Sequence, residues 1–255
     1  MTGALLVSLP VILAVFAGLW FHQARTKNAT LVDAAWALGI GAQTALLGHF
    51  SDGDYMRRLV VTGLVGVWSV RLGGHLFFNR VLAGHEDGRY RHFRDNWAQS
   101  TWFGFYMLQG LLVFLLPLTF LGALRNPLPF TTTADVAGLA LWALALSGEG
   151  VADGQLEKFR ADPDHRGKTC RQGLWRFSRH PNYFFEWVMW LSFVPMAWGS
   201  SSFAASLAGP ALMFFFLTRV SGVPPAEAQA LRSRGDDYRD YQRTTNAFFP
   251  WFPRS

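Results

Sequence analysis

Charge and cysteine are scarce in this sequence. Charged residues make up 16% of its 255 residues, compared with about 25% in soluble globular domains. The single cysteine, Cys170, excludes an internal disulfide and a metal site built from cysteines. A repeat of fixed period and a low-complexity linker are also missing, so we expect one domain over residues 1–255.

Long apolar runs, by contrast, are abundant. Hydrophobic residues make up 51% of the chain, with 23 Phe and 11 Trp. Seven runs of about 20 mostly apolar residues are each long enough to cross a bilayer as a helix. They cover residues 4–22, 31–48, 59–78, 102–122, 135–152, 183–199 and 202–219. The sequence therefore predicts an all-α fold, a polytopic membrane helix bundle with seven transmembrane helices.

Lysine and arginine are distributed unevenly between the loops. The loops 23–30, 79–101 and 153–182 and the tail from 219 contain 19 of them, and the alternate loops contain 3. Cytoplasmic loops of membrane proteins are enriched in Lys and Arg, which predicts an N-terminus outside and a cytoplasmic C-terminus. The net charge of +6 follows this topology, so nucleic acid is not expected as a partner.

Polar side chains lie at helical spacing inside the third predicted span. Arg71, His75 and Asn79 recur every four residues and therefore share one helix face, beside Arg80. An arginine inside a span normally faces a partner or a cavity. The alternative is that its long side chain extends to the membrane interface.

Acidic residues mark the ends of two other spans. Glu149 and Asp153 lie four apart near the end of the fifth span, followed by Arg160. They form either a polar site or a solvated helix end. Asp33 and Trp36 open the second span, where an acid is also favoured by the helix dipole alone.

Aromatic and basic residues alternate in the loop segment RYRHFR, residues 89–94. Most loop charges are solvated, yet this combination also stacks on an adenine and clamps a phosphate. Tyr90 and Arg94 are the candidates here.

The densest polar segment is RHPNYFFEW, residues 179–187, which contains Arg179, His180, Asn182, Tyr183 and Glu186. Pro181 suits the first turn of a helix, which places Arg179 and His180 at its N-terminus. Asn182 and Glu186 share a face and suit the carboxamide of a nicotinamide. Arginines such as Arg171 and Arg179 suit phosphates. The pattern fits a nicotinamide dinucleotide better than S-adenosylmethionine, which has no phosphate.

Five segments together resemble the steroid 5-alpha-reductase family, in particular its bacterial seven-span branch. They are VDAAW, RYRHFR, EGVADGQLEKFR, QGLWRFSRHPNYFFEW and DDYRDYQRTTNAFFPWFP, in the order expected for that family. The resemblance covers about residues 30–253. It implies a seven-helix bundle in a bacterial inner membrane, with NADPH entering from the cytoplasm and a lipid substrate entering from the bilayer.

The patterns and the resemblance together predict an NADPH site without a metal. The residues predicted to bind the cofactor are Arg71, His75, Asn79, Arg80, Tyr90, Arg94, Glu149, Asp153, Arg160, Arg171, Arg179, His180, Asn182, Tyr183 and Glu186. The lipid or steroid-like substrate is predicted to lie against Trp36 and Trp68. A Gly-rich dinucleotide fingerprint is missing, as the all-helical family implies.

The chain departs from the family at the catalytic positions. Members that reduce 3-keto steroids use a Tyr on the third helix and a Glu on the second. Trp68 stands at the Tyr position here, and no Glu follows Trp36, which leaves Asp33 as the candidate catalytic acid.

We therefore expect an NADPH-dependent reductase of a conjugated C=C bond in a steroid-like or isoprenoid lipid, with no obligate protein partner. One alternative is a methyltransferase resembling the isoprenylcysteine carboxyl methyltransferases, which share the Arg-His-Pro-x-Tyr segment. Those enzymes have Gly soon after the Tyr, where this chain has Phe184 and Phe185. The other alternative is a catalytically silent lipid-binding membrane protein.

Overall fold

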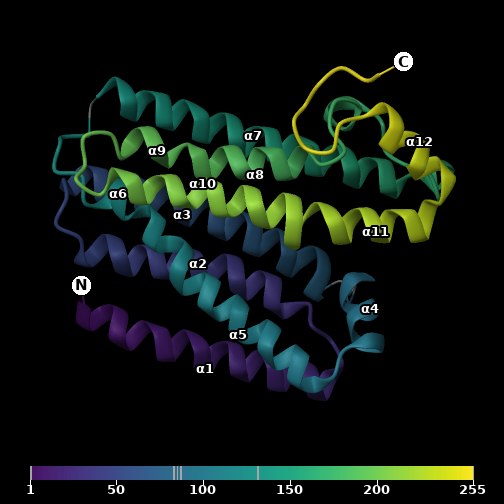
Figure 1. Cartoon of the computed structure of the whole chain (residues 1–255), viewed down its shortest axis with the longest axis horizontal. Coiled ribbons are helices and arrows are strands. Elements are labelled where there is room, and N and C mark those ends of the chain that lie inside the picture. Colours follow the sequence, from purple (N-terminus) through teal and green to yellow (C-terminus); the bar gives the residue numbers. More distant parts are fainter. Residues whose placement is uncertain (1, 83, 85, 87, 131, 255) are drawn as a thin grey trace. The chain divides into compact units, whose positions relative to one another are not determined.

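The computed structural model describes residues 2–82, 84, 86, 88–130 and 132–254 (Figure 1). Every regular element within these residues is a helix, which confirms the predicted all-α class. The chain divides into two compact units. Unit 1 comprises Met1–Thr132 and Met196–Leu207, and unit 2 comprises Thr133–Pro195 and Ala208–Ser255.

Unit 1 is built around α2, which contacts α1, α3 and α5. Its elements are α1 (Thr2–Thr26), α2 (Leu31–Phe50), α3 (Tyr55–Leu76), the π-helical η1 (Phe77–Leu82), α4 (Gly88–Asn96), α5 (Gln99–Leu115), η2 (Leu116–Phe120) and α6 (Leu121–Leu124). Small residues allow α2 and α3 to approach closely, as is typical of membrane helices. A Cβ added at Gly41 would lie 2.3 Å from the Ser69 hydroxyl, which itself donates to the Ala37 carbonyl at 2.8 Å.

Unit 2 contains the segment that the sequence marks as densest in polar groups. Its elements are α7 (Thr133–Ala161), η3 (Pro163–His165), η4 (Gly173–Arg176), α8 (Pro181–Leu191), most of α9 (Phe193–Met196) and of α10 (Phe203–Phe215), η5 (Phe216–Val220), α11 (Val223–Arg234) and α12 (Asp236–Thr244). α8 packs along α7. At their contact Gly148 leaves room for the Phe185 ring, because a Cβ there would lie 2.4 Å from it.

Six helical stretches of the described chain are long and apolar enough to cross a membrane: Thr2–Thr26, Leu31–Phe50, Tyr55–Leu82, Gln99–Leu124, Thr133–Ala161 and Phe203–Arg234. The chain is thus a polytopic membrane protein, but the expected count of seven is not confirmed.

The segment expected to form the sixth of seven spans, 183–199, corresponds to α8 and α9, which are interrupted at Ser192. Pro195 has no N–H to offer to the carbonyl four residues earlier, which accounts for the break. Together these two helices extend about 24 Å at 1.5 Å per residue, less than the roughly 30 Å of a hydrocarbon core.

Candidate functional site

Asp33 is the centre of an ionic cluster in unit 1. The carboxylate lies in the first turn of α2 and accepts hydrogen bonds from the Tyr90 hydroxyl of α4 and from Arg80 of η1, the latter at 3.3 Å. Arg89 lies 3.9 Å from the same carboxylate. Two guanidinium groups and a phenol therefore point at Asp33, whose carboxylate oxygens accept hydrogen bonds in this cluster.

A second carboxylate ties the loop before α4 to the start of α2. Glu86 accepts the backbone N–H of Ala29 at 2.8 Å and pairs with both terminal nitrogens of Arg94, at 2.6 and 2.7 Å. Burial raises the pKa of Glu86, but the Arg94 and Ala29 donors outweigh it and hold this pKa below its ordinary value. The same pairing raises the pKa of Arg94. Arg94 is therefore engaged in holding the loop before α4 to the start of α2.

Two residues of the predicted polar face lie together where α3 continues into η1. His75 Nδ1 and Asn79 Nδ2 lie 3.0 Å apart, as expected for neighbours on one face, and Arg71 lies one turn earlier. Trp68 is fully buried, and its ring meets the Trp36 ring edge-on with centroids 6.4 Å apart. The two tryptophans predicted to contact substrate therefore contact each other.

In unit 2 the polar groups of α7 and α8 meet along the contact of the two helices. Asn182 Nδ2 donates to Asp153 Oδ1 at 3.3 Å, and Asn182 Oδ1 accepts the N–H of Tyr183 at 3.0 Å. Glu186, one turn further along α8, is buried and accepts the Trp190 indole N–H at 2.9 Å. Glu149, one turn before Asp153, is also buried. Buried glutamates in apolar helices are costly unless they are paired or hydrogen-bonded, and they commonly mark functional sites.

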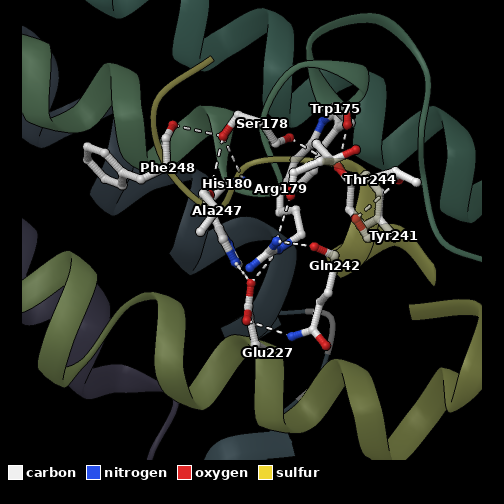
Figure 2. A network of polar contacts seen from close by, with 11 residues as sticks. Trp175, Ser178, Arg179, His180, Glu227, Tyr241, Gln242, Thr244, Ala247 and Phe248 are labelled. Carbon is white, nitrogen blue, oxygen red and sulfur yellow. Dashed lines mark hydrogen bonds and ion pairs between the residues drawn. The ribbon is translucent and has the colours of Figure 1, made fainter. Parts of the chain in front are cut away.

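The first residues of the RHPNY segment belong to a network centred on Glu227 of α11 (Figure 2). Glu227 Oε1 accepts from Arg179 Nε at 2.7 Å and lies 3.3 Å from His180 Nε2. Its other oxygen accepts from Gln242 of α12 at 2.7 Å. The Arg179 guanidinium also donates to the carbonyls of Gln242 and Thr245, at 3.0 and 2.6 Å. Arg179 thus fastens the chain before α8 to α11 and α12.

His180 lies between this network and α8. Its ring stacks on the Tyr183 ring, with centroids 5.2 Å apart and planes 4° apart. Burial lowers the pKa of His180, and Glu227 opposes this shift without cancelling it. The imidazole is therefore neutral near pH 7. The Glu227 carboxylate can only accept, so the neutral ring donates to it from Nε2.

The remaining predicted cations of unit 2 are exposed. Arg160 lies in the last turn of α7, and Arg171 follows η3 in the connection to α8. Arg171 donates to the side chain and to the carbonyl of Asp237, at 3.0 and 2.6 Å. Since both partners of that ion pair are substantially exposed, a phosphate can compete for this arginine more easily than for Arg179.

The structure brings the predicted residues together in two groups. Asp33, Arg80 and Tyr90 meet in unit 1, and Asp153, Asn182, His180 and Tyr183 are linked in unit 2 by the contacts described above. Sequence patterns did not reveal Glu227, Gln242 or Glu86, the groups that hold the predicted cations and His180. Glu227 and Gln242 do not lie at a four-residue helical spacing from the residues that the sequence marked as site candidates, and Glu86 precedes the first turn of α4.

The family model described as "Protein of unknown function (DUF1295)" matches residues 19–245, from the last third of α1 to the residue after α12. The chain belongs to the DUF1295 family. The match spans residues of both units, including those of the Asp33 cluster and of the Glu227 network. The comparisons with curated proteins and with solved structures give no match.

Proposed function

We propose that this protein is an NADPH-dependent reductase of a conjugated C=C bond in a steroid-like or isoprenoid lipid. The observation that carries the proposal is the contact of α7 and α8, where Asn182 bonds Asp153 and the buried Glu186 lies one turn further on. An amide beside carboxylates, inside otherwise apolar helices, suits the carboxamide of a nicotinamide. The resemblance to the steroid 5-alpha-reductase family assigns these same positions to the cofactor.

The donors present in unit 2 fit such a ligand. Asn182, Asp153 and Glu186 offer an amide and two carboxylates to its uncharged polar end, and the exposed Arg160 and Arg171 offer guanidinium groups to its phosphates. Arg179 is occupied by Glu227 and two carbonyls, so we assign to it the positioning of the chain before α8. NADPH, when bound, supplies the hydride.

The Asp33 cluster is proposed to stabilise the negative charge that develops on the substrate oxygen. Asp33 accepts hydrogen bonds from Tyr90 and Arg80, so its part is to hold these two side chains in place. Their O–H and N–H groups are the donors in the cluster that suit a developing oxyanion. Trp36, which is half-buried, is proposed to offer an apolar surface to a flat or long lipid, and the fully buried Trp68 supports its ring from behind.

The site is proposed to open to the cytoplasm of a bacterial cell whose inner membrane holds the protein. The uneven loop charge supports this orientation, since the loops rich in Lys and Arg carry Arg80, Arg94, Arg160 and Arg171.

Titration of the purified protein with NADPH tests the proposal. We expect Asn182→Ala and Glu186→Ala each to weaken NADPH binding about tenfold or more, where tenfold corresponds to about 1.4 kcal/mol. Asp236→Ala is the control, because this exposed carboxylate of α12 lies in an ion pair with the exposed Arg239, outside the proposed site. Its affinity for NADPH is expected to match that of the unmodified protein.

The same titration with S-adenosylmethionine separates the two enzyme classes. Tight binding of S-adenosylmethionine, lost in Asn182→Ala, would replace the reductase by a methyltransferase. Unchanged NADPH affinity in both variants would contradict the cofactor site at α7 and α8. Binding of a lipid without either nucleotide would point to a silent lipid-binding protein.

A further inference from the structure

The chain after α12 is irregular, with bends at Thr245 and at residues 247–249, and it is hydrogen-bonded to the segment before α8. We call residues 246–254 the C-terminal strap. Its backbone accepts the N–H of Arg179 at Asn246, at 2.8 Å, and donates from Trp251 to the carbonyl of Phe177, at 2.9 Å. The Ser178 hydroxyl donates to the carbonyl of Phe248 at 2.9 Å (Figure 2). These hydrogen bonds hold the backbone of the strap in place, and the backbone in turn fixes the directions of its side chains.

The aromatic side chains of the strap point in two directions. Phe248 is only 6% exposed, and its ring packs against those of Trp187 of α8 and Phe214 of α10, at 6.1 and 5.4 Å. Phe249, Trp251 and Phe252 are 51%, 69% and 73% exposed. Three large aromatic side chains on a fixed backbone form an exposed apolar patch, which in a soluble setting is unfavourable.

The depth of this patch follows from its contacts with α10. Phe214 lies within the membrane-spanning stretch Phe203–Arg234, and its neighbour Phe215 is exposed to the surroundings of that stretch. The Phe249 ring lies 5.9 Å from the Phe214 ring. Arg219, the first charged residue of the stretch, comes five residues after Phe214, or about 7.5 Å along the helix. The strap therefore lies near the level where hydrocarbon meets headgroups.

We propose that the strap is an interfacial membrane anchor: Trp251 and Phe252 insert at the boundary of lipid headgroups and acyl chains, beside the lipid-facing side of α10. Tryptophan prefers this boundary, because its ring is apolar and its N–H finds lipid acceptors. Residues 245–253 carry no charge, and Arg254 follows them, placed to meet lipid phosphates. A bilayer is the expected occupant because the patch continues the surface of a spanning helix.

Spin labels on single cysteines test this placement. In a Cys170→Ser background, Trp251→Cys and Phe252→Cys are labelled separately, and the protein is reconstituted into phosphatidylcholine–phosphatidylglycerol vesicles. Arg243→Cys is the matched control, because its side chain is 76% exposed on the neighbouring α12. Collision with oxygen, which concentrates in lipid, is compared with collision with a water-soluble nickel chelate.

Both strap labels are expected to collide mainly with oxygen, and the Arg243 label mainly with the nickel chelate. Nickel accessibility of either strap label equal to that of the Arg243 label would overturn the anchor. Dipolar broadening between strap labels, lost on dilution with unlabelled protein, would overturn it in favour of a second copy of the chain. The result is independent of whether the protein binds NADPH.

Discussion

At the scale of single residues, carboxylate partners decide what the arginines offer to a ligand. Arg94 is paired through two hydrogen bonds with Glu86, and Arg179 is held by Glu227 and two carbonyls. Removing an arginine from such an arrangement leaves a partly buried carboxylate without its partner. Loss of ligand binding in an Arg179 variant would therefore report a displaced α8 as readily as a lost phosphate contact.

His180 makes the stability of unit 2 depend on pH. Burial, with Arg179 and Arg234 nearby, lowers its pKa below the 6.5 of an unfolded chain, against the opposing effect of Glu227. Between the two pKa values the unfolded chain binds a proton that the folded protein does not, so stability rises with pH there. We predict that the melting temperature in detergent is steady above about pH 6.5 and falls as the pH drops below it.

The variant His180→Gln separates this contribution from that of other groups. Its melting temperature is expected to fall less steeply below about pH 6.5 than that of the unmodified protein. His92→Gln, at an exposed position of α4, is the control and should retain the full slope. Identical slopes in the two variants would show that His180 titrates alike in folded and unfolded chains.

The prediction about which substrate is reduced rests on Trp68. In the resemblance to the steroid 5-alpha-reductases, Trp68 stands where those enzymes carry a phenol. Its indole N–H is a much weaker acid, and the ring is packed edge-on against Trp36. Loss of one oxyanion donor typically costs about 10²–10³ in rate. We predict slow or absent reduction of a 3-keto-Δ4 steroid, followed by NADPH absorbance. Rapid turnover that persists in Asp33→Asn would contradict both the assignment of Trp68 and the role of the Asp33 cluster.

At the scale of elements, the contact of α7 and α8 depends on a glycine. A side chain at Gly148 would meet the Phe185 ring, whereas nothing lies within 4 Å of a Cβ at Gly154 on the same helix. We predict that Gly148→Val lowers the free energy of unfolding by about 1–3 kcal/mol, the usual cost of overpacking. Gly154→Val should leave it almost unchanged. Because Asn182 and Asp153 meet at this contact, Gly148→Val should also weaken NADPH binding. Equal free energies of unfolding for Gly148→Val and Gly154→Val would contradict the packing of Phe185 against Gly148.

The spacing of residues along the sequence predicted the helices better than it predicted which side chains of distant segments contact one another. Six of the seven apolar runs coincide with the membrane-spanning stretches, and the four-residue spacing placed His75 beside Asn79 because η1 continues α3. Glu227 escaped prediction because it is 48 residues from Arg179, and only the folding of α11 against the start of α8 brings them together. The break at Ser192 was likewise missed, since the apolar run continues through Pro195 and hydropathy does not register a missing N–H.

At the scale of the whole molecule, the loop charges make the orientation testable. Chains with 19 Lys or Arg on one set of loops and 3 on the other are expected to keep the richer set in the cytoplasm. We predict that green fluorescent protein inserted at Gly167, an exposed turn after η3, is fluorescent, and that alkaline phosphatase there is inactive. The reciprocal pair at the exposed Asp52, between α2 and α3, should give the opposite result. Phosphatase activity at Gly167 would place the proposed NADPH contacts Arg160 and Arg171 outside the cell, away from the cofactor, and would remove the reductase proposal together with the topology.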